Sequence, residues 1–230
     1  MTGSDASRPA WMERVAEQLA QDTPEYFRTF APPVGWHRRS AVLMLFAPGA
    51  PSAPGVPGAR GEQVLLTERA PHLRSHPGQV SFPGGRMDPE DETIVRTALR
   101  EAQEEVGVAP GDVDVVLTMP ELFLTPSQNS VAPVLAWCPA PSPARVIDPN
   151  EVARAAWVPV ADLVDPARRF TVTHPLGYRG PGFEAEGLFV WGFTAMLLSS
   201  LLDIAGLALP WDEGREVPLP DRLASPGLRS

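Results

Sequence analysis

Apolar side chains along the chain follow two spacings, and the wider one predicts helices. Residues 91–106 repeat them at three- and four-residue intervals, which is typical of a helix with one buried face, and Gly107 supplies a C-terminal stop. A second helix is expected over residues 9–19. Residues 187–207 are apolar nearly all round and predict a strand end followed by a buried helix. Within the helix over 91–106, the residues expected to face the interior are Ala98, Leu99, Ala102 and Val106.

Shorter apolar runs predict β-strands. Residues 40–46 and 62–67 form two such runs, which we expect to pair with each other. Further strands are expected over residues 112–119, 130–137 and 169–173. Pro133 lies inside one of these runs, and because proline has no backbone N–H it predicts an irregular or edge position. Residues 153–163 fit neither spacing clearly.

Proline and glycine are concentrated in two parts of the chain, and they suggest its organisation. Residues 47–61 form a Pro/Gly-rich stretch between two strands, which we interpret as a flexible insertion. The Pro-rich segment from Pro210 onward is expected to be a surface tail. The sequence contains no repeat and suggests no second hydrophobic core. We therefore expect residues 1–230 to form a single domain.

The charge balance excludes several classes of function. Acidic residues number 28 against 19 basic ones, so the net charge of −9 disfavours binding to nucleic acid or to a membrane surface. All 19 basic residues are arginine, which excludes Schiff-base chemistry on a lysine. No apolar run reaches the roughly 18 residues of a membrane span, and the start of the chain lacks a secretory pattern. With Cys138 as the only cysteine, we expect a cytoplasmic protein without disulfides.

Three glutamates in the helix over 91–106 are the clearest candidates for chemistry. Glu101, Glu104 and Glu105 stand at positions i, i+3 and i+4 and can share one face. Like charges so placed repel by about 0.2–0.5 kcal/mol per pair in an isolated helix. A divalent cation such as Mg²⁺, which prefers oxygen ligands, would offset that repulsion. The alternative is a solvated acidic face, which is what such a cluster most often is.

A glycine turn leads into this helix and makes the metal interpretation more specific. In the segment SFPGGRMD, residues 81–88, Gly84 and Gly85 allow the backbone to approach a phosphate or a metal closely. The turn and the helix together resemble the signature of the Nudix hydrolase family. The matching residues are Gly85, Glu92, Arg100, Glu101, Ala102, Glu104, Glu105, Gly107 and Val108.

Two departures from the Nudix pattern concern the loop and one aliphatic position. The pattern places five residues between its glycine and its first glutamate, whereas six separate Gly85 from Glu92. Either the loop is one residue longer or Asp91 takes that role. Ala102 is smaller than the usual aliphatic residue.

The residues just before the turn narrow the resemblance. Residues 65–91 are similar to the additional signature of the coenzyme A pyrophosphatase subgroup. The resemblance implies an α/β fold, a Nudix-type α/β/α sandwich with a mixed sheet between helices. It also implies hydrolysis of the diphosphate bond of coenzyme A, giving adenosine 3′,5′-bisphosphate and 4′-phosphopantetheine. Mg²⁺ or Mn²⁺ is the implied cofactor and a small nucleotide derivative the implied partner.

The resemblance also suggests roles for individual acids. Glu101 and Glu105 are the expected metal ligands, together with the carbonyl oxygen of Gly85. Glu104 could bind a second ion or accept the proton of the attacking water, and the sequence does not separate these roles. Arg100 is expected to pair with Glu92 or Glu104 and so to orient the acidic cluster.

Further candidates lie outside the helix. Arg69 and Arg74 could hold the diphosphate or the 3′-phosphate, but plain surface arginines are equally consistent with the pattern. His76 and Gln79 could contact substrate or stabilise their own turn. Glu151 could bring another acid to the site, with an exposed acid as the alternative.

The sequence leaves two other functions open. A Nudix pyrophosphatase acting on NADH or on ADP-ribose would need the same metal site. A non-catalytic module that only binds a nucleotide would not need three mutually repelling carboxylates. The oligomeric state cannot be read from the sequence.

Overall fold

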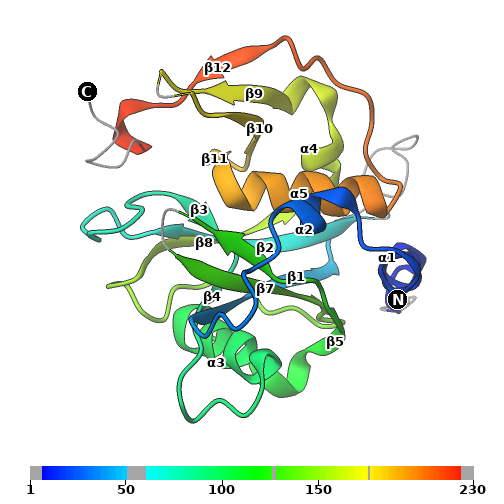
Figure 1. Ribbon diagram of the computed structural model, residues 1–230, viewed down its shortest axis with the longest axis vertical. Coiled ribbons are helices and arrows are strands. Elements are labelled where there is room, and N and C mark those ends of the chain that lie inside the picture. The colour runs from blue at the N-terminus through cyan, green and yellow to red at the C-terminus, as the bar shows by residue number, and fades with distance from the viewer. Residues whose placement is uncertain (1–6, 51–60, 126–127, 176, 224–230) are drawn as a thin grey trace.

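The computed structural model describes residues 7–50, 61–125, 128–175 and 177–223. Most of the Pro/Gly-rich stretch expected over 47–61 therefore lies outside the described residues. A large sheet occupies the centre, with helix α3 on one face and α5 on the other, and a smaller sheet lies beyond α5 (Figure 1). The chain thus has an α/β architecture with a mixed sheet flanked by helices, as expected.

The elements follow one another from α1 to β12. The helices are α1 (Ala10–Gln21), α2 (Glu25–Thr29), α3 (Ile94–Val106), α4 (Val160–Val164) and α5 (Gly192–Ile204). The large sheet contains β1 (Arg39–Pro48), β2 (Glu62–Arg69), β3 (Val80–Ser81), β4 (Gly84–Arg86), β5 (Asp114–Thr118), β6 (Leu122–Leu124), β7 (Asn129–Trp137) and β8 (Val152–Pro159). The smaller sheet contains β9 (Arg169–Thr173), β10 (Arg179–Ala185), β11 (Leu188–Val190) and β12 (Glu216–Pro218). Single 3₁₀ turns cover Pro110–Asp112, Pro166–Arg168 and Asp221–Leu223.

Strand β1 organises the large sheet because both of its edges are paired. It runs parallel to β7 and antiparallel to β2 and β4, which makes the sheet mixed. Its side chains alternate between two hydrophobic clusters: Leu43 and Leu45 pack with α3, whereas Met44 and Phe46 pack with α5. Burial on both faces explains why the strand has an uninterrupted apolar sequence.

Helix α3 has capping groups at both ends. The Thr93 side chain accepts a hydrogen bond from the backbone N–H of Arg96 at 3.2 Å, so the helix begins at Ile94. Gly107 ends it in the left-handed conformation, with φ 71°. The face that we expected to be buried is buried at Ala98, Ala102 and Val106, while Leu99 is partly buried and packs against the same cluster.

Pro133 lies at an irregular position of the sheet, as one of the two expectations had it, and not at an edge. Strand β7 is paired on both sides, with β1 on one and with β5 and β6 on the other. The Pro133 carbonyl accepts a bond from Met119, which follows β5, so Pro133 faces the break between β5 and β6. The missing N–H therefore costs no ladder hydrogen bond.

The segment after Pro210 is more ordered than the surface tail that we expected. Residues Glu216–Pro218 pair in parallel with β9, and Leu219 and Leu223 are buried. These leucines join Phe170 and Val172 in a separate hydrophobic cluster, which the sequence did not suggest. A three-residue strand between prolines has too few positions to show an alternating pattern.

The segment over 153–163, which fitted neither spacing, divides between two elements. It forms most of β8 and the start of α4. Within the described ranges, none of the helices combines the length and the hydropathy needed to cross a bilayer.

Candidate functional site

The glycine turn lies directly against α3. In β4, Gly85 pairs with Ala41 and Gly84 with Val42. A Cβ atom at Gly84 would come within 2.3 Å of the Ala41 carbonyl oxygen. At Gly85 it would come within 2.5 Å of the Glu101 carboxylate. Both positions therefore need glycine for space, and the second forms a cradle for the carboxylate.

Glu105 is the most buried acid of the helix. Its side chain accepts a hydrogen bond from the Gly84 N–H at 3.2 Å, and the residue is 5% exposed. Burial raises the pKa of Glu105 to about 8, and the negative charges of Glu101 and Glu151 act in the same direction. The Gly84 N–H and the positive charge of Arg69 oppose that shift. A buried carboxylate with so few compensating partners is costly unless a cation is supplied.

Glu101 shares this environment. Its side chain is 14% exposed, and burial raises its pKa, opposed by Arg100. The charges of Glu104 and Glu151 also raise the pKa of Glu101, so that three other carboxylates, including Glu105, lie within electrostatic reach of it.

Arg100 holds the exposed side of the cluster in place. Its Nη1 donates to Glu101 at 3.1 Å and to Glu104 at 3.0 Å. Its Nη2 donates to Asp91 at 2.9 Å and to the carbonyl oxygen of Arg86 at 3.0 Å. One guanidinium thus fixes carboxylates from the loop and from two positions of the helix, and the expected pairing with Glu104 is present.

Asp91, rather than Glu92, occupies the first acidic position. It accepts bonds from Arg100 and from the Thr97 hydroxyl at 2.9 Å, and the Arg100 bond is the main cause that lowers its pKa to about 2. Glu92 is exposed and forms no hydrogen bond or ion pair with any described residue. The Arg100–Glu92 pairing offered from the sequence is therefore wrong. The signal was available, because five residues separate Gly85 from Asp91.

The donor set suits a hard divalent cation at an open site. Across the described ranges, no three His, Cys, Asp or Glu side chains are grouped so as to enclose an ion. Glu101 and Glu105 offer two carboxylates next to the Gly85 cradle, while Glu104 is engaged by Arg100. Mg²⁺ commonly takes one or two carboxylates and leaves its other positions to water and substrate phosphate. These residues therefore fit such an ion.

Arg69 and Glu151 lie within electrostatic reach of the same cluster. Strand β2 ends at Arg69, and the N–H of the next residue, Ala70, donates to the carbonyl oxygen of Glu151 at 2.8 Å. The charge of Arg69 lowers the pKa of Glu105, and the charge of Glu151 raises it. The Arg69 Nε is buried and has no hydrogen-bond partner among the described groups. The sequence could not reveal this unused donor, because spacing says nothing about side-chain partners.

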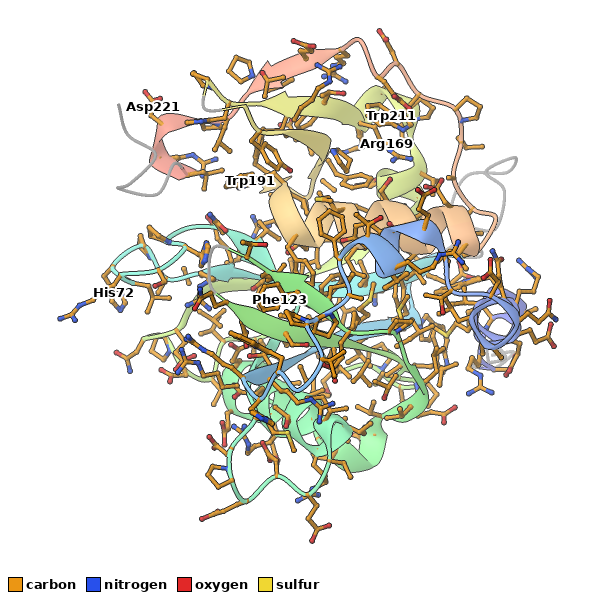
Figure 2. The ribbon with its side chains drawn as sticks, viewed as in Figure 1. His72, Phe123, Arg169, Trp191, Trp211 and Asp221 are labelled. Carbon is orange, nitrogen blue, oxygen red and sulfur yellow. The ribbon has the colours of Figure 1, made fainter. Side chains whose placement is uncertain are left out.

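The loop between β2 and β3 contains the other three candidates. The backbone N–H of Gln79 donates to the His76 carbonyl at 3.3 Å, and the Gln79 side chain bonds to the His76 ring. His76 keeps an exposed edge, but partial burial, followed by the charge of Arg69, lowers its pKa. Arg74 is exposed and forms no ion pair with another described residue. The nearby His72 points outward from the loop (Figure 2).

The structure thus brings one group of candidates together and leaves one apart. The group near the glycine turn consists of Glu101, Glu104, Glu105, Arg100, Arg69 and Glu151. His76 and Gln79 adjoin Arg69. Arg74 stands on the surface of the same loop.

Comparison with known proteins identifies the family. The NUDIX domain family matches residues 50–175, more than half of the chain. The Nudix hydrolase NudL of Salmonella paratyphi B, described as uncharacterized, is 39% identical over 145 residues, which are 60% of this chain and 72% of the Salmonella protein. The crystal structure of RenU, a Nudix hydrolase from M. smegmatis, is similar in fold, with a TM-score of 0.50 and 23% identity over 76% of this chain and 89% of that one. Nudix hydrolases generally use divalent metal ions. This chain therefore belongs to the Nudix family and is a pyrophosphatase that acts on nucleoside diphosphate derivatives.

Proposed function

We propose that the substrate is coenzyme A, free or acylated, and that hydrolysis of its diphosphate gives adenosine 3′,5′-bisphosphate and 4′-phosphopantetheine. The proposal is supported by the subgroup resemblance over residues 65–91. The observation that carries it is Arg69, whose buried Nε has no acceptor in the part of the chain that the structure describes and whose charge acts on Glu105. Arg100, in contrast, already contacts three carboxylates and a carbonyl.

An unused cation at this place suits a diphosphate. A phosphoanhydride resists attack because its oxygens repel an incoming nucleophile, so positive charge is needed around it. Arg69 offers a fixed guanidinium whose geometry matches phosphate oxygens. Coenzyme A carries a further phosphate on the ribose, and the exposed Arg74 lies on the loop that Arg69 begins.

We assign the metal to Glu101 and Glu105, with the Gly85 carbonyl as a third donor. Mg²⁺ or Mn²⁺ bound there would neutralise phosphate charge and lower the pKa of a water molecule. Arg100 is a positioning residue, since it acts by holding Glu101 and Glu104. For the proton acceptor we favour a carboxylate oxygen of Glu151 over Glu104, because Arg100 engages Glu104 and no described cation pairs with Glu151.

The substrate assignment is tested with coenzyme A, NADH and ADP-ribose, each supplied with Mg²⁺ or Mn²⁺ and with a chelator as control. We expect the highest kcat/KM with coenzyme A and no turnover in the chelator. Preference for NADH or ADP-ribose would replace the substrate and keep the metal site. Nucleotide binding without turnover would indicate a non-catalytic module.

Two arginine variants test the phosphate contacts. Arg69→Gln should lower kcat/KM for coenzyme A and for dephospho-coenzyme A by about tenfold or more, because both contain the diphosphate. Arg74→Gln should weaken only the preference for the 3′-phosphorylated substrate. Equal activity of Arg69→Gln and the unaltered protein would remove the main support for the proposal.

A further inference from the structure

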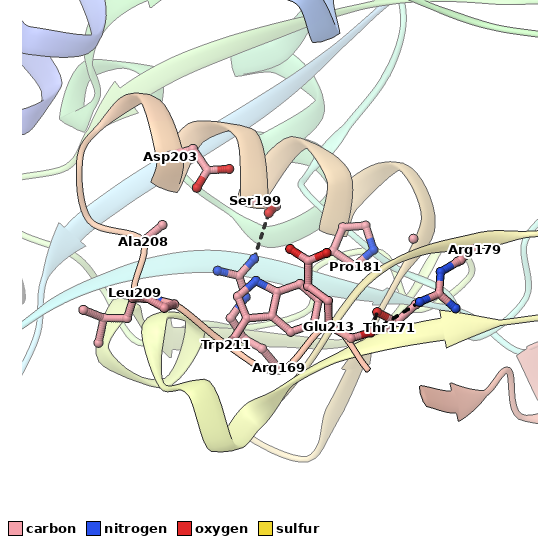
Figure 3. Close-up of a pocket in the computed structure, with 12 residues that line it drawn as sticks. Arg169, Thr171, Arg179, Pro181, Ser199, Asp203, Ala208, Leu209, Trp211 and Glu213 are labelled. Atoms are coloured by element: carbon pink, nitrogen blue, oxygen red, sulfur yellow. Dashed lines mark hydrogen bonds between the residues drawn. The ribbon is translucent and has the colours of Figure 1, made fainter. Parts of the chain in front are cut away.

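A hollow lies on the other side of the large sheet from α3. It measures about 680 Å³ and is bounded by α5, β9, β10 and the segment 208–213 (Figure 3). Hollows of this size are typical of small-molecule sites. Arg169 and Trp211 face it from above α5, on the side of the smaller sheet (Figure 2). None of the Nudix residues contributes to it.

A buried guanidinium is the central feature of this hollow. Arg169 is 2% exposed, and its guanidinium lies 5.0 Å from the ring centroid of Phe183 and 4.7 Å from that of Trp211. Its Nη2 donates to the Ser199 hydroxyl at 2.8 Å (Figure 3). The two rings and the serine fix the cation in position. Its Nε is buried and has no hydrogen-bond partner among the described residues.

Two carboxylates line the same hollow without neutralising this cation. Asp203, on α5, and Glu213 both act electrostatically on Arg169, and the charge of Glu213 also acts on Asp203. Neither forms an ion pair within 4 Å with Arg169 or with another described cation. The other cation at the rim, Arg179, is already paired with Glu216. The hollow therefore presents one fixed positive charge and two free negative charges.

This charge pattern selects the ligand chemistry. A polyphosphate or a simple dianion would be repelled by Asp203 and Glu213. A polyamine would be repelled by Arg169. A molecule with one anionic and one cationic group complements both walls. Arginine recognises carboxylates through paired N–H donors, and an ammonium group suits carboxylate acceptors.

We propose that this hollow binds a small zwitterion with a carboxylate and an ammonium group, an aminocarboxylate. Its carboxylate lies at Arg169 and its ammonium group at Asp203 and Glu213. The site is separate from the Nudix site, so the proposal does not depend on which nucleotide derivative is hydrolysed.

The test is isothermal titration calorimetry of the full chain with ω-aminocarboxylates from glycine to 6-aminohexanoate, a series that varies the distance between the charges. Hexanoate and hexylamine are the single-charge controls. We expect at least one member of the series to bind with a Kd of about 1 mM or tighter, and at least roughly tenfold more tightly than either control. If no member does so, or if hexanoate or hexylamine binds equally well, the proposal is wrong.

Variants locate the binding. Asp203→Asn should weaken the best ligand by about tenfold, whereas Glu184→Gln, an exposed acid on β10 outside the hollow, should leave it unchanged. Arg169→Gln should abolish binding. Because Arg169 is buried, that variant can fail to fold, and the exposed Asp203 then decides the outcome. Equal affinity of the Asp203 and Glu184 variants would overturn the assignment.

Discussion

Helices α3 and α5 are both thirteen residues long and lie on opposite faces of the large sheet, but they are used differently. Helix α3 buries one face against the sheet and turns the other toward the glycine turn, where its carboxylates gather. Helix α5 has the large sheet on one side and the smaller sheet on the other, and apolar residues cover most of its surface. Its margin, at Ser199 and Asp203, reaches the hollow that contains Arg169.

The two helices differ in whether their side chains serve mainly the reaction or mainly the stability of the fold. A helix buried on one face can present charge to a ligand without losing its packing, whereas a helix enclosed on both sides gains stability from every position. Polar substitutions of the α3 carboxylates should therefore reduce activity and leave the fold intact. Truncations on α5 should loosen the fold and leave turnover per folded molecule intact.

The largest expected effect comes from Glu105→Gln on α3. Loss of the buried metal ligand should lower turnover about 10³-fold, equivalent to roughly 4 kcal/mol. Urea unfolding should show no loss of stability in the metal-free protein, because folding then no longer requires this carboxyl group to take up a proton or to be buried as an anion. Steady-state release of 4′-phosphopantetheine and titration with Mn²⁺ measure the two losses. Unchanged turnover would refute the ligand role.

Leu198→Ala tests the opposite helix. Leu198 is fully buried, and its truncation should lower the free energy of unfolding by about 3 kcal/mol. Urea denaturation gives that value, and kcat of the folded fraction should equal that of the unaltered protein. A fall in kcat without a fall in stability would mean that α5 shapes the active site, and the contrast between the helices would fail.

The free energy of unfolding should depend on pH through Glu105 of α3. Glu105 titrates near pH 8 in the folded, metal-free protein but near 4.5 when unfolded, so the folded state holds an extra proton between these values. In a chelator, stability should fall as the pH rises from 5 to 8, by up to about 3 kcal/mol. Urea midpoints measure the slope, which Glu105→Gln should remove. A slope that persists in this variant would have another source.

The smallest effect should come from the loop that supports α3. Asp91→Asn weakens the main partner of Arg100 and should reduce kcat about tenfold through loss of positioning. Glu92→Gln is the matched control and should be neutral, since Glu92 is exposed. Because the folded pKa of Asp91 is about 2, its contribution to stability should disappear only below about pH 4. The opposite ranking of the two variants would restore Glu92 to the signature position.

The sequence was informative wherever a local pattern determines structure. The 3.6-residue spacing and Gly107 predicted α3. The glycine turn, together with Glu101 and Glu105, predicted which face of α3 lies against that turn. Both depend on short-range geometry, which spacing encodes. The choice between Asp91 and Glu92 needed the position of Arg100, but counting from Gly85 also favours Asp91.

Features built by distant contacts were not predictable. The smaller sheet depends on β12 pairing with β9, about forty-five residues earlier in the chain, and a short Pro-flanked strand does not announce its partner. The Nε atoms of Arg69 and Arg169 are buried and have no hydrogen-bond partner among the described residues. Which side chains come within hydrogen-bond distance of these atoms depends on the whole fold, so the sequence pattern does not show it.

The late position of β12 has a consequence for the protein during its synthesis. Residues 39–164 supply all strands of the large sheet and α3, so this part can assemble on the ribosome while later residues are still being added. Strand β9 emerges soon after, with Phe170 and Val172 still awaiting Leu219 and Leu223, which follow β12. Translational pausing just before residue 216 would prolong the exposure of these two side chains and of the unpaired edge of β9, and a chaperone that binds extended apolar segments would find its target there.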